Sequence, residues 1–276
     1  MKKIICTLLL LTPALALGSA GPKLERAPVN THNTPSLQHG AQVFVNYCLS
    51  CHSASYMRYN RLTDLQLMEQ QIKDNLMFAA DKVGETMTVA MRSKDAAQWF
   101  GVPPPDLTVI ARSRGADWLY TYLRGFYPDK SRPMGWNNVV FPNVGMPHVL
   151  YALQGVRPLT VVEVSPIRDE KSGATTGYQR QTSVFDVTGA RSNRLEKLAG
   201  ADHHAFVEYK WGEPVGGQFS VQQFDELVAD LVNYLVYMGE PSANARTRYG
   251  IYTLLYVVLL IAVTYVLKRA YWKDVH

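Results

Sequence analysis

The sequence predicts a mainly α-helical domain that is exported across a membrane and held there by one C-terminal helix. Three observations lead to this prediction. Residues 1–20 have the form of a secretory signal, apolar residues recur at helical spacing along much of residues 21–245, and residues 249–267 contain no charged side chain. Residues 268–276 then form a cytoplasmic tail. Residues 158–217 interrupt the helical pattern as a loop-rich insert.

Composition and charge exclude several classes of protein. The chain has 276 residues, 47% hydrophobic and 18% charged, which is typical of globular proteins and excludes a disordered or fibrous one. The formal net charge is +5, and it falls to +3 when Lys2 and Lys3 leave with the signal. So small a bias gives no support to nucleic-acid binding. The three cysteines do not form the widely spaced pattern of a disulfide framework.

The N-terminal signal has its three parts in the expected order. Two lysines give a charged start, an apolar run follows from Ile4 to Leu17, and small residues end at Ala20, after which cleavage is expected. The alternative, a transmembrane anchor, is disfavoured because the run is shorter than the ~20 residues that a bilayer requires. Cys6 is therefore removed, and the chain after Ala20 is expected on the periplasmic side of the inner membrane.

The C-terminal apolar segment is long enough to span a bilayer. A helix over residues 249–267 is about 28 Å long, close to the hydrocarbon thickness of a membrane. Tyr249 and Tyr252 at one end, and Tyr271 and Trp272 at the other, stand where interfacial aromatic residues gather. The alternative is a buried core helix, which rarely lacks a polar face over such a length.

Helices are expected at both ends of the exported domain. Apolar residues recur at helical spacing from Ser36, and this helix delivers Cys48 at its end. Near the other end, Ser220 and Gln223 match a capping box, and an apolar stripe continues until Gly239. A short link then joins this second helix to the span, so it is expected close to the membrane surface.

Two further helices are expected between these. One begins at a capping box formed by Thr63 and Gln66, and it buries Met68 in an apolar stripe. The other runs from Asp106 to Arg124, directly after three prolines that would break a preceding helix. Residues 158–217 instead show short alternating runs around turn residues, which predict loops with one hairpin.

Cys48, Cys51 and His52 form the Cys-Leu-Ser-Cys-His signature of a covalently attached c-type haem. Two thiols at this spacing can each form a thioether with a haem vinyl group. His52 then supplies one axial nitrogen, and we expect a backbone carbonyl to hold its other ring nitrogen. A thioredoxin-like dithiol would require the pair between a strand and a helix, and structural zinc would require four ligands.

The second axial ligand of an electron-transferring haem is often a methionine, and nine are present. Most are expected elsewhere: in the removed signal, on helices, in apolar surroundings, or too close to His52. Met134 in a Pro-Met-Gly loop and Met146 in a Gly-Met-Pro loop remain, and each loop can hold a thioether rigidly. From the residues alone these two are nearly equal candidates.

Further motifs resemble those of the cytochrome c1 family of bacterial bc1 complexes. They are residues 40–47, residues 53–61, residues 104–107 with Arg112 and Arg114, residues 145–147, and the C-terminal span. This resemblance covers almost all of the chain and implies a class I cytochrome c-like helical haem domain. It favours Met146 over Met134 as the axial ligand. It also places Arg112 near a haem propionate, where a guanidinium can pair with the carboxylate; the alternative is a solvated helix charge.

The resemblance fits least over residues 158–217, where His203 and His204 are expected at the surface. It implies a subunit that is not catalytic alone and that carries one covalently bound haem c. Such a subunit takes an electron from the Rieske iron–sulfur protein and passes it to a cytochrome c. Its anchor packs beside cytochrome b in a dimeric multisubunit complex, a quinol–cytochrome c oxidoreductase. The alternatives are an anchored monohaem cytochrome that serves another dehydrogenase, and a haem peroxidase with an open iron site.

Overall fold

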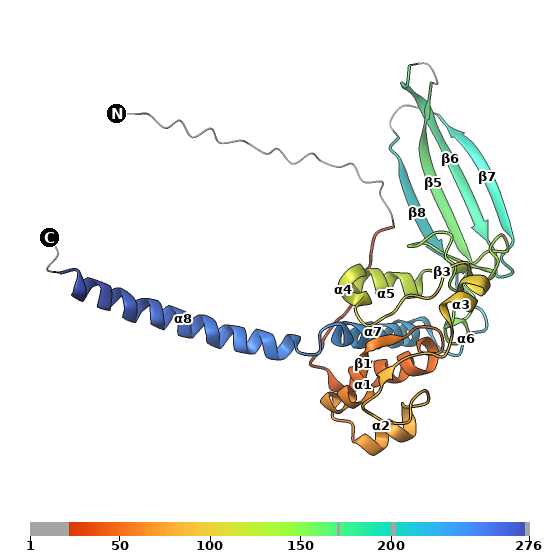
Figure 1. Ribbon diagram of the computed structural model, residues 1–276. Helices are drawn as coiled ribbons and strands as arrows, with labels where there is room; N and C mark the ends of the chain where they lie inside the picture. The colour runs from red at the N-terminus through yellow and green to blue at the C-terminus, as the bar shows by residue number, and fades with distance from the viewer. Residues whose placement is uncertain (1–21, 170–171, 200–202, 274–276) are drawn as a thin grey trace, which may run out of the picture.

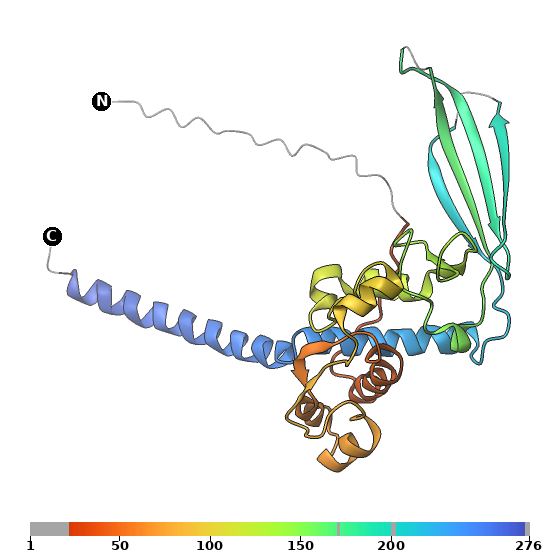
Figure 2. The same ribbon diagram turned by 45° about the vertical axis from the view of Figure 1, so that its right-hand side comes forward.

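The computed structural model describes residues 22–169, 172–199 and 203–273. The predicted signal, residues 1–20, lies outside these ranges. Figure 1 shows a helical domain, an antiparallel sheet that projects from one end of it, and a long helix, α8, that leaves on the other side. The turned view in Figure 2 shows the same separation of the sheet from α8. The haem signature lies in the helical domain, between these two extensions.

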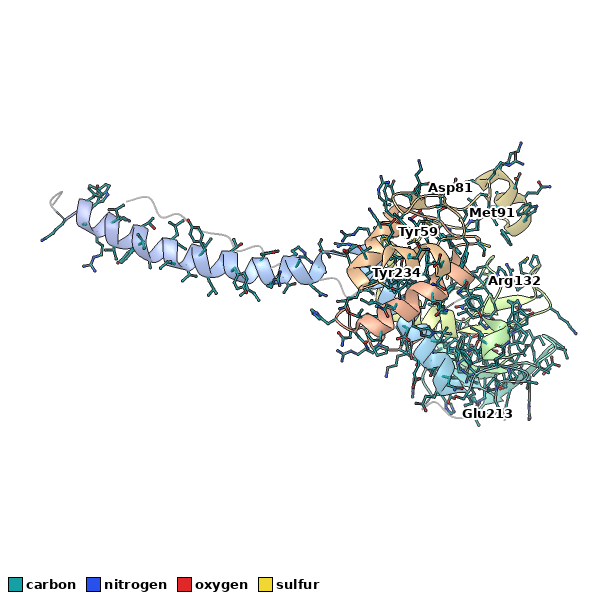
Figure 3. All side chains as sticks on the ribbon, turned by 90° about the horizontal axis from the view of Figure 1, so that it is seen from below. Tyr59, Asp81, Met91, Arg132, Glu213 and Tyr234 are labelled. Atoms are coloured by element: carbon teal, nitrogen blue, oxygen red, sulfur yellow. The ribbon has the colours of Figure 1, made fainter. Side chains whose placement is uncertain are left out.

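Two helices that are far apart in the sequence form the centre of the helical domain. Helix α1, Thr34–Val43, packs along helix α7, Val221–Gly239, and helix α5, Ala116–Arg124, contacts another part of α7. Tyr59 and Tyr234 are fully buried in the core around them (Figure 3). The helices predicted at the two ends of residues 21–245 are thereby confirmed, and they pack against each other.

The ends of these helices follow from local sequence. Asn33 caps α1, because its side chain accepts a hydrogen bond from the backbone N–H of Ser36. Ser220 and Gln223 form the predicted capping box of α7. Helix α1 continues into a π-helical turn, Phe44–Cys48, so the haem signature begins where the helix ends.

Helices α1 and α7 approach so closely that no side chain fits between them at Gly40. A Cβ atom on Gly40 would collide with the backbone carbonyl of Asp230 and would lie 2.8 Å from Cβ of Tyr234. Beside this contact, the Ser36 hydroxyl donates to the Asp230 carboxylate at 2.5 Å. The position of α1, which delivers Cys48, is therefore determined by its contact with α7.

The helix predicted from Thr63 is wrong in where it begins. Tyr59–Leu65 forms a 3₁₀ helix, and Gln66 then adopts a left-handed conformation with φ of 63°. A residue in this conformation ends a right-handed helix. Helix α2, Glu69–Asn75, starts only after it, and Met68 is 66% exposed instead of belonging to the core.

The single helix predicted from Asp106 to Arg124 is in fact two helices. Helix α4, Ile110–Arg114, ends at Gly115, whose φ of 88° is a conformation that glycine adopts at little cost. Helix α5 follows directly. The chain before α4 is also not helical, because the Asp106 side chain accepts a hydrogen bond from the N–H of Thr108 and forms a turn.

The other elements of the helical domain are short and lie in the connections. They are β1 (Ala54–Arg58), β2 (Thr86–Met87), α3 (Ser93–Phe100), β3 (Phe126–Pro128), β4 (Trp136–Asn138) and α6 (Tyr151–Gln154). Strand β1 pairs with β2, and β3 pairs with β4, both antiparallel. Strand β1 starts two residues after His52, and the loop after β4 carries Met146.

Residues 158–217 form a four-stranded antiparallel sheet, so the prediction of a loop-rich insert is wrong. Its strands are β5 (Leu159–Arg168), β6 (Thr175–Phe185), β7 (Arg191–Leu198) and β8 (Phe206–Trp211). They lie in the order β7-β6-β5-β8. The predicted hairpin is the β5–β6 pair. Strand β7 escaped prediction because it is mostly polar and charged, and pairing along β6 makes it a strand. With this sheet, the description "mainly α" is not confirmed.

A small apolar cluster ties the base of the sheet to the helical domain. It consists of the buried residues Tyr127, Val139, Leu159 and Phe185. The Tyr127 and Phe185 rings lie 4.7 Å apart, and they join the β3–β4 ladder to strand β6. The rest of the sheet extends beyond the domain (Figure 1), so most of its side chains are at least partly exposed.

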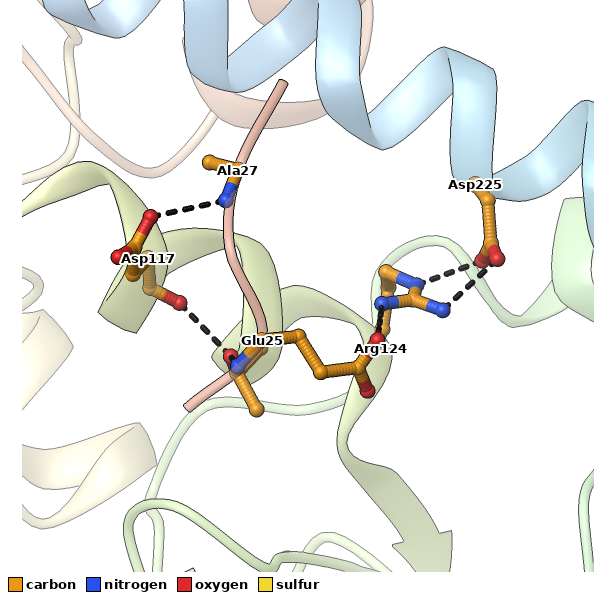
Figure 4. A network of polar contacts seen from close by, with 6 residues as sticks. Glu25, Ala27, Asp117, Arg124 and Asp225 are labelled. Carbon is orange, nitrogen blue, oxygen red and sulfur yellow. Dashed lines mark hydrogen bonds and ion pairs between the residues drawn. The ribbon is translucent and has the colours of Figure 1, made fainter. Parts of the chain in front are cut away.

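The segment around Glu25 and Ala27 runs along α5, and α5 in turn is linked to α7 (Figure 4). The N–H of Ala27 donates to Asp117 at 2.8 Å. Arg124 donates to both carboxylate oxygens of Asp225, at 2.6 and 2.7 Å, and to Glu25 at 2.5 Å. The Arg124 side chain is only 14% exposed, so this bidentate pair links α5 to α7 within a largely dry contact.

Helix α8, Ala243–Tyr271, is the one helix of the described residues that is long and apolar enough to cross a membrane. Its 29 residues correspond to about 44 Å, and its mean hydropathy reaches 2.3. None of its side chains is buried against the domain. It contains the predicted span, residues 249–267. The predicted link, Ser242–Arg248, is helical from Ala243 onward.

The close contact of α1 and α7 gives a first prediction. Gly40→Ala is expected to lower the free energy of unfolding by about 3 kcal/mol, because the new methyl group must push two packed backbones apart. Thermal or urea unfolding of the purified haem-loaded protein measures this. Gly84→Ala is the control, since nothing lies within 4 Å of its Cβ position. Equal stabilities for the two variants would contradict the described packing.

Candidate haem-attachment site

The haem signature forms one tight turn at the end of α1. The N–H groups of Cys51 and His52 both donate to the carbonyl oxygen of Cys48, at 3.1 and 2.8 Å. The two thiols and the imidazole therefore originate from a single turn of backbone. Both cysteines are free, with Cys48 buried and Cys51 half-buried. Burial raises the pKa of the Cys48 thiol to about 12, so this group is a neutral thiol.

The ring of His52 is oriented by a backbone carbonyl, as expected. Its Nδ1 lies 2.8 Å from the carbonyl oxygen of Pro105, which accepts its hydrogen. This contact leaves Nε2 without a proton and free to bind a metal. Burial lowers the pKa of His52, against the opposing effects of the Pro105 hydrogen bond and the Asp106 charge. A half-buried neutral imidazole with one free nitrogen has the chemistry of an axial haem ligand.

Two segments come together behind His52 through a series of polar contacts. The N–H of Leu107 donates to the carbonyl of Ser53, and the N–H of Ser55 donates to the Asp106 carboxylate, both at 2.8 Å. The other Asp106 oxygen accepts from the N–H and the hydroxyl of Thr108, at 2.8 and 2.6 Å. Burial raises the pKa of Asp106, but these hydrogen bonds outweigh it and lower the pKa.

A cavity of about 250 Å³ lies beside Cys51. It is lined by residues from three segments: Cys51, Ser53, Ser55, Val89, Met91, Ser93, Ala96, Pro103, Pro104 and Asp106. The N–H of Val89 donates to the Ser53 hydroxyl at 3.1 Å, which ties the second segment to the first. A larger hollow of about 390 Å³ between α1 and α2 contains amide side chains and neither cysteine, so it does not belong to this site.

Met146 lies in a loop that passes α3, the helix that also lines the Cys51 cavity. A Cβ atom on Gly145 would lie 2.8 Å from the carbonyl oxygen of Phe100, at the end of α3. The Met146 sulfur accepts a hydrogen bond from the Tyr122 hydroxyl at 3.4 Å. Met134 lies in the turn between β3 and β4. The Met146 loop thus contacts the C-terminal end of α3, whereas the residues of α3 that line the Cys51 cavity are Ser93 and Ala96.

Arg112 has a protein carboxylate as its partner. Its Nη1 donates to Glu240 at 2.6 Å, just beyond the end of α7, and its side chain is 59% exposed. Arg246 from the start of α8 binds the same carboxylate at 2.6 Å. His203 and His204, expected at the surface, lie in the connection between β7 and β8, where His204 is exposed. Neither histidine belongs to the haem-attachment site.

Sequence reasoning missed two residues close to Met146. His148 is buried, stacks on Phe126 at 4.9 Å and places Nε2 2.7 Å from the Gln154 side-chain oxygen. Burial lowers its pKa to about 4, so it is neutral at physiological pH. Tyr122 is the second missed residue. Its place on α5 gave no signal in the sequence, because only the tertiary structure brings it to the Met146 loop.

Known proteins share the sequence features of this chain. The profile described as the Cytochrome C1 family matches residues 25–155 and 205–275. The chain belongs to the cytochrome c1 family. The segment that the profile leaves unmatched, residues 156–204, contains strands β5, β6 and β7. The family therefore accounts for the helical domain and α8, while most of the projecting sheet is an addition to it.

Two relatives match the whole chain, and a third matches most of it. It is 44% identical to cytochrome c1 of Allochromatium vinosum, with 99% of that protein covered. It is 41% identical, with 99% covered, to a Nitrosomonas europaea protein named ammonia monooxygenase gamma subunit. Cytochrome c1 of Rhodospirillum rubrum is 24% identical over 88% of this chain and 83% of the relative. The Allochromatium vinosum and Nitrosomonas europaea relatives are aligned along the full chain, including the sheet.

This membership makes the chain a membrane-anchored electron-transfer cytochrome with a c-type haem. The residues present fit that group. Two free thiols share one turn with an imidazole whose Nδ1 is occupied, and an open cavity adjoins Cys51. A site for some other metal has less support, since the described residues contain no cluster of three His, Cys, Asp or Glu side chains.

The contacts of Asp106 give the second prediction. Asp106→Ala is expected to lower the free energy of unfolding by about 1–2 kcal/mol at neutral pH, because hydrogen bonds behind His52 are lost. The folded-state pKa of Asp106 lies below its ordinary value of 3.8, so its stabilisation exists above pH 3.8. It is lost as the pH falls through the folded pKa. The difference between wild type and variant should therefore shrink in acid.

Unfolding followed at several pH values, together with the visible spectrum, tests this prediction. Asp186→Ala is the matched control, because Asp186 makes the same type of turn with Thr188 in the projecting sheet. It should leave the haem spectrum unchanged. A stability difference for Asp106→Ala that stays constant down to pH 2 would contradict the role of the ionised carboxylate.

Proposed function

We propose that this protein is the cytochrome c1 subunit of a bacterial bc1 complex. It takes one electron at a time from the Rieske iron–sulfur protein and passes it to a cytochrome c. Cys48 and Cys51 would hold one haem c covalently, with His52 and Met146 as its axial ligands. The observation that carries the proposal is the His52 ring, whose Nδ1 is bound to Pro105 and whose Nε2 is free, on the same turn as the two thiols. The subunit is not catalytic alone.

The protein's part in this function would be to hold the haem, enclose it and orient it. When bound, the haem supplies one-electron chemistry at its iron. With His52 and Met146 as its ligands, the iron would have no place for a substrate, and electrons would pass through the haem edge. A thioether ligand would favour ferrous over ferric iron, which suits a high-potential carrier. The resemblance implies that Arg112 pairs with a haem propionate. To do so Arg112 would have to leave Glu240, and its exposed side chain is free to move.

Helix α8 would anchor the subunit with the haem domain on the periplasmic side of the inner membrane. The predicted signal, residues 1–20, supports export of the domain, and residues 268–276 would remain in the cytoplasm. The side chains of α8 are uncharged and mostly apolar along the predicted span, and none is buried in the domain, so they would be free to contact lipid and cytochrome b. The proposed assembly is a dimeric multisubunit complex.

A second function is favoured by one observation, the name of the Nitrosomonas europaea relative, ammonia monooxygenase gamma subunit. A chain of this family could serve as the electron-transfer subunit of another membrane oxidoreductase. The chemistry at the haem would be the same in both cases, and only the partners would differ.

Purification of the subunit in mild detergent from its native host separates the two functions, and this is the third prediction. We expect b-type haems and an iron–sulfur protein to co-purify, and quinol to reduce the haem. Mass spectrometry should show the chain after Ala20 with one haem added and no free thiol. Co-purification with a different oxidoreductase and without b-type haem would favour the second function. Unmodified thiols would contradict both.

The axial ligand gives the fourth prediction. Met146→Leu is expected to shift the reduction equilibrium of the haem by at least about 100-fold towards the ferric form, because the thioether that favours ferrous iron is lost. The variant should also bind carbon monoxide, which the wild type should not. Met134→Leu is the control and should behave as wild type in both respects. A shift confined to Met134→Leu would assign the ligand to Met134 instead.

A further inference from the structure

We propose that Tyr122 positions the axial methionine, and that its hydroxyl raises the reduction potential by donating a hydrogen bond to the Met146 thioether. The inference rests on the proposed function, in which Met146 binds the iron. It is carried by the 3.4 Å contact between the Tyr122 hydroxyl and the Met146 sulfur. A thioether sulfur has two lone pairs and is a weak acceptor. One pair can bind iron while the other accepts the phenol hydrogen.

The Tyr122 ring is held so that its hydroxyl has little freedom. It stacks on Trp118 with ring centres 4.7 Å apart and an angle of 11° between the planes. Phe126 meets its other side edge-on, at 5.2 Å. A phenolic hydroxyl is an O–H donor that keeps its proton throughout the physiological range. The phenol is therefore a permanent and oriented donor.

The start of the Met146 loop is held by the residue that also binds the backbone of Tyr122. The Asn138 side chain donates to the carbonyl of Tyr122 at 2.8 Å. Its oxygen accepts from the N–H groups of Val140 and Phe141, at 2.9 and 3.2 Å. Asn138 is fully buried. The buried Asn138 amide thus fixes both the end of the helix that carries the Tyr122 hydroxyl and the start of the loop that carries the Met146 sulfur.

The rest of the loop is held by a second set of contacts. Asn143 adopts a left-handed conformation with φ of 62°, and its N–H donates to the Asn137 side chain at 2.8 Å. Arg132 donates to the Asn143 side-chain oxygen and carbonyl, at 3.1 and 3.0 Å. Gly145 passes directly against the carbonyl of Phe100. These contacts make the approach of Met146 to Tyr122 a property of the fold and not of a mobile side chain.

The direction of the effect on the reduction potential follows from the change in electron density at the Met146 sulfur. A hydrogen bond withdraws electron density from the sulfur, so the thioether donates less to the iron. Ferric iron, which carries the larger charge, loses more from this change than ferrous iron. The contact therefore favours the reduced form, and hydrogen bonds around a haem ligand are an established means of setting a potential.

The test compares Tyr122→Phe with wild type in redox titrations of the haem-loaded protein, and it is the fifth prediction. Removing the hydroxyl should shift the reduction equilibrium about threefold towards the ferric form, about 28 mV at about 59 mV per tenfold for one electron. The control is Tyr120→Phe on the same helix, which also loses a hydroxyl, from a ring packed on Arg124. It should leave the potential unchanged. A ring-fluorinated tyrosine at position 122, a stronger donor of similar size, should shift the potential in the opposite direction.

Spectroscopy adds a readout that a purely structural role would not move. The charge-transfer band between methionine sulfur and ferric iron should change in energy in Tyr122→Phe and stay as in wild type in Tyr120→Phe. If Met146→Leu lowers the potential while Tyr122→Phe leaves potential and band unaltered, the role of Tyr122 is overturned and the proposed function stands. If Met146→Leu changes neither, the ligand assignment fails, and the role of Tyr122 fails with it.

Discussion

The backbone of helix α1 at Gly40 lies directly against the backbone of Asp230 and Cβ of Tyr234 in helix α7. Much of the structure depends on this contact. Helix α1 ends in the turn that carries Cys48, whereas α7 leads within a few residues into the apolar helix α8. The contact therefore joins the haem signature, near the start of the chain, to the membrane anchor at its end. Because no side chain separates the helices, the signature turn has a defined position relative to the anchor.

Hydrogen bonds add to the apolar packing of Cys48 and Leu49 in shaping the surroundings of the signature turn. The Pro105 carbonyl holds His52, and Asp106 joins the segment after the signature to the start of α4. On the methionine side, Asn138 and Tyr122 perform a comparable task. Short polar loops can hold ligands at defined positions only when nearly every buried donor and acceptor is satisfied. Within the described residues, the two buried side-chain atoms that lack a partner are Tyr59 Oη and Arg132 Nε.

The projecting sheet is built on different principles from the haem domain. Its strands are held mainly by their own ladders, and one small cluster that includes Tyr127 and Phe185 attaches it to the domain. The family profile passes over most of it, whereas the Allochromatium vinosum and Nitrosomonas europaea relatives align along it. Most of the sheet is thus an addition to the part of the chain that the family profile matches, and it lies outside the contact between α1 and α7.

The sequence by itself determined the two end helices, the apolar span and the haem signature, because each depends on local spacing: a capping box, an uncharged run, or two cysteines and a histidine within five residues. It reduced the choice of axial methionine to Met146 and Met134, and family resemblance favoured Met146. Only the tertiary structure decided the sheet, since the polar strand β7 is made by pairing with β6. The same holds for Pro105 on His52 and Tyr122 on Met146. These contacts join residues 53 and 24 positions apart, and no local pattern records which distant groups the fold brings together.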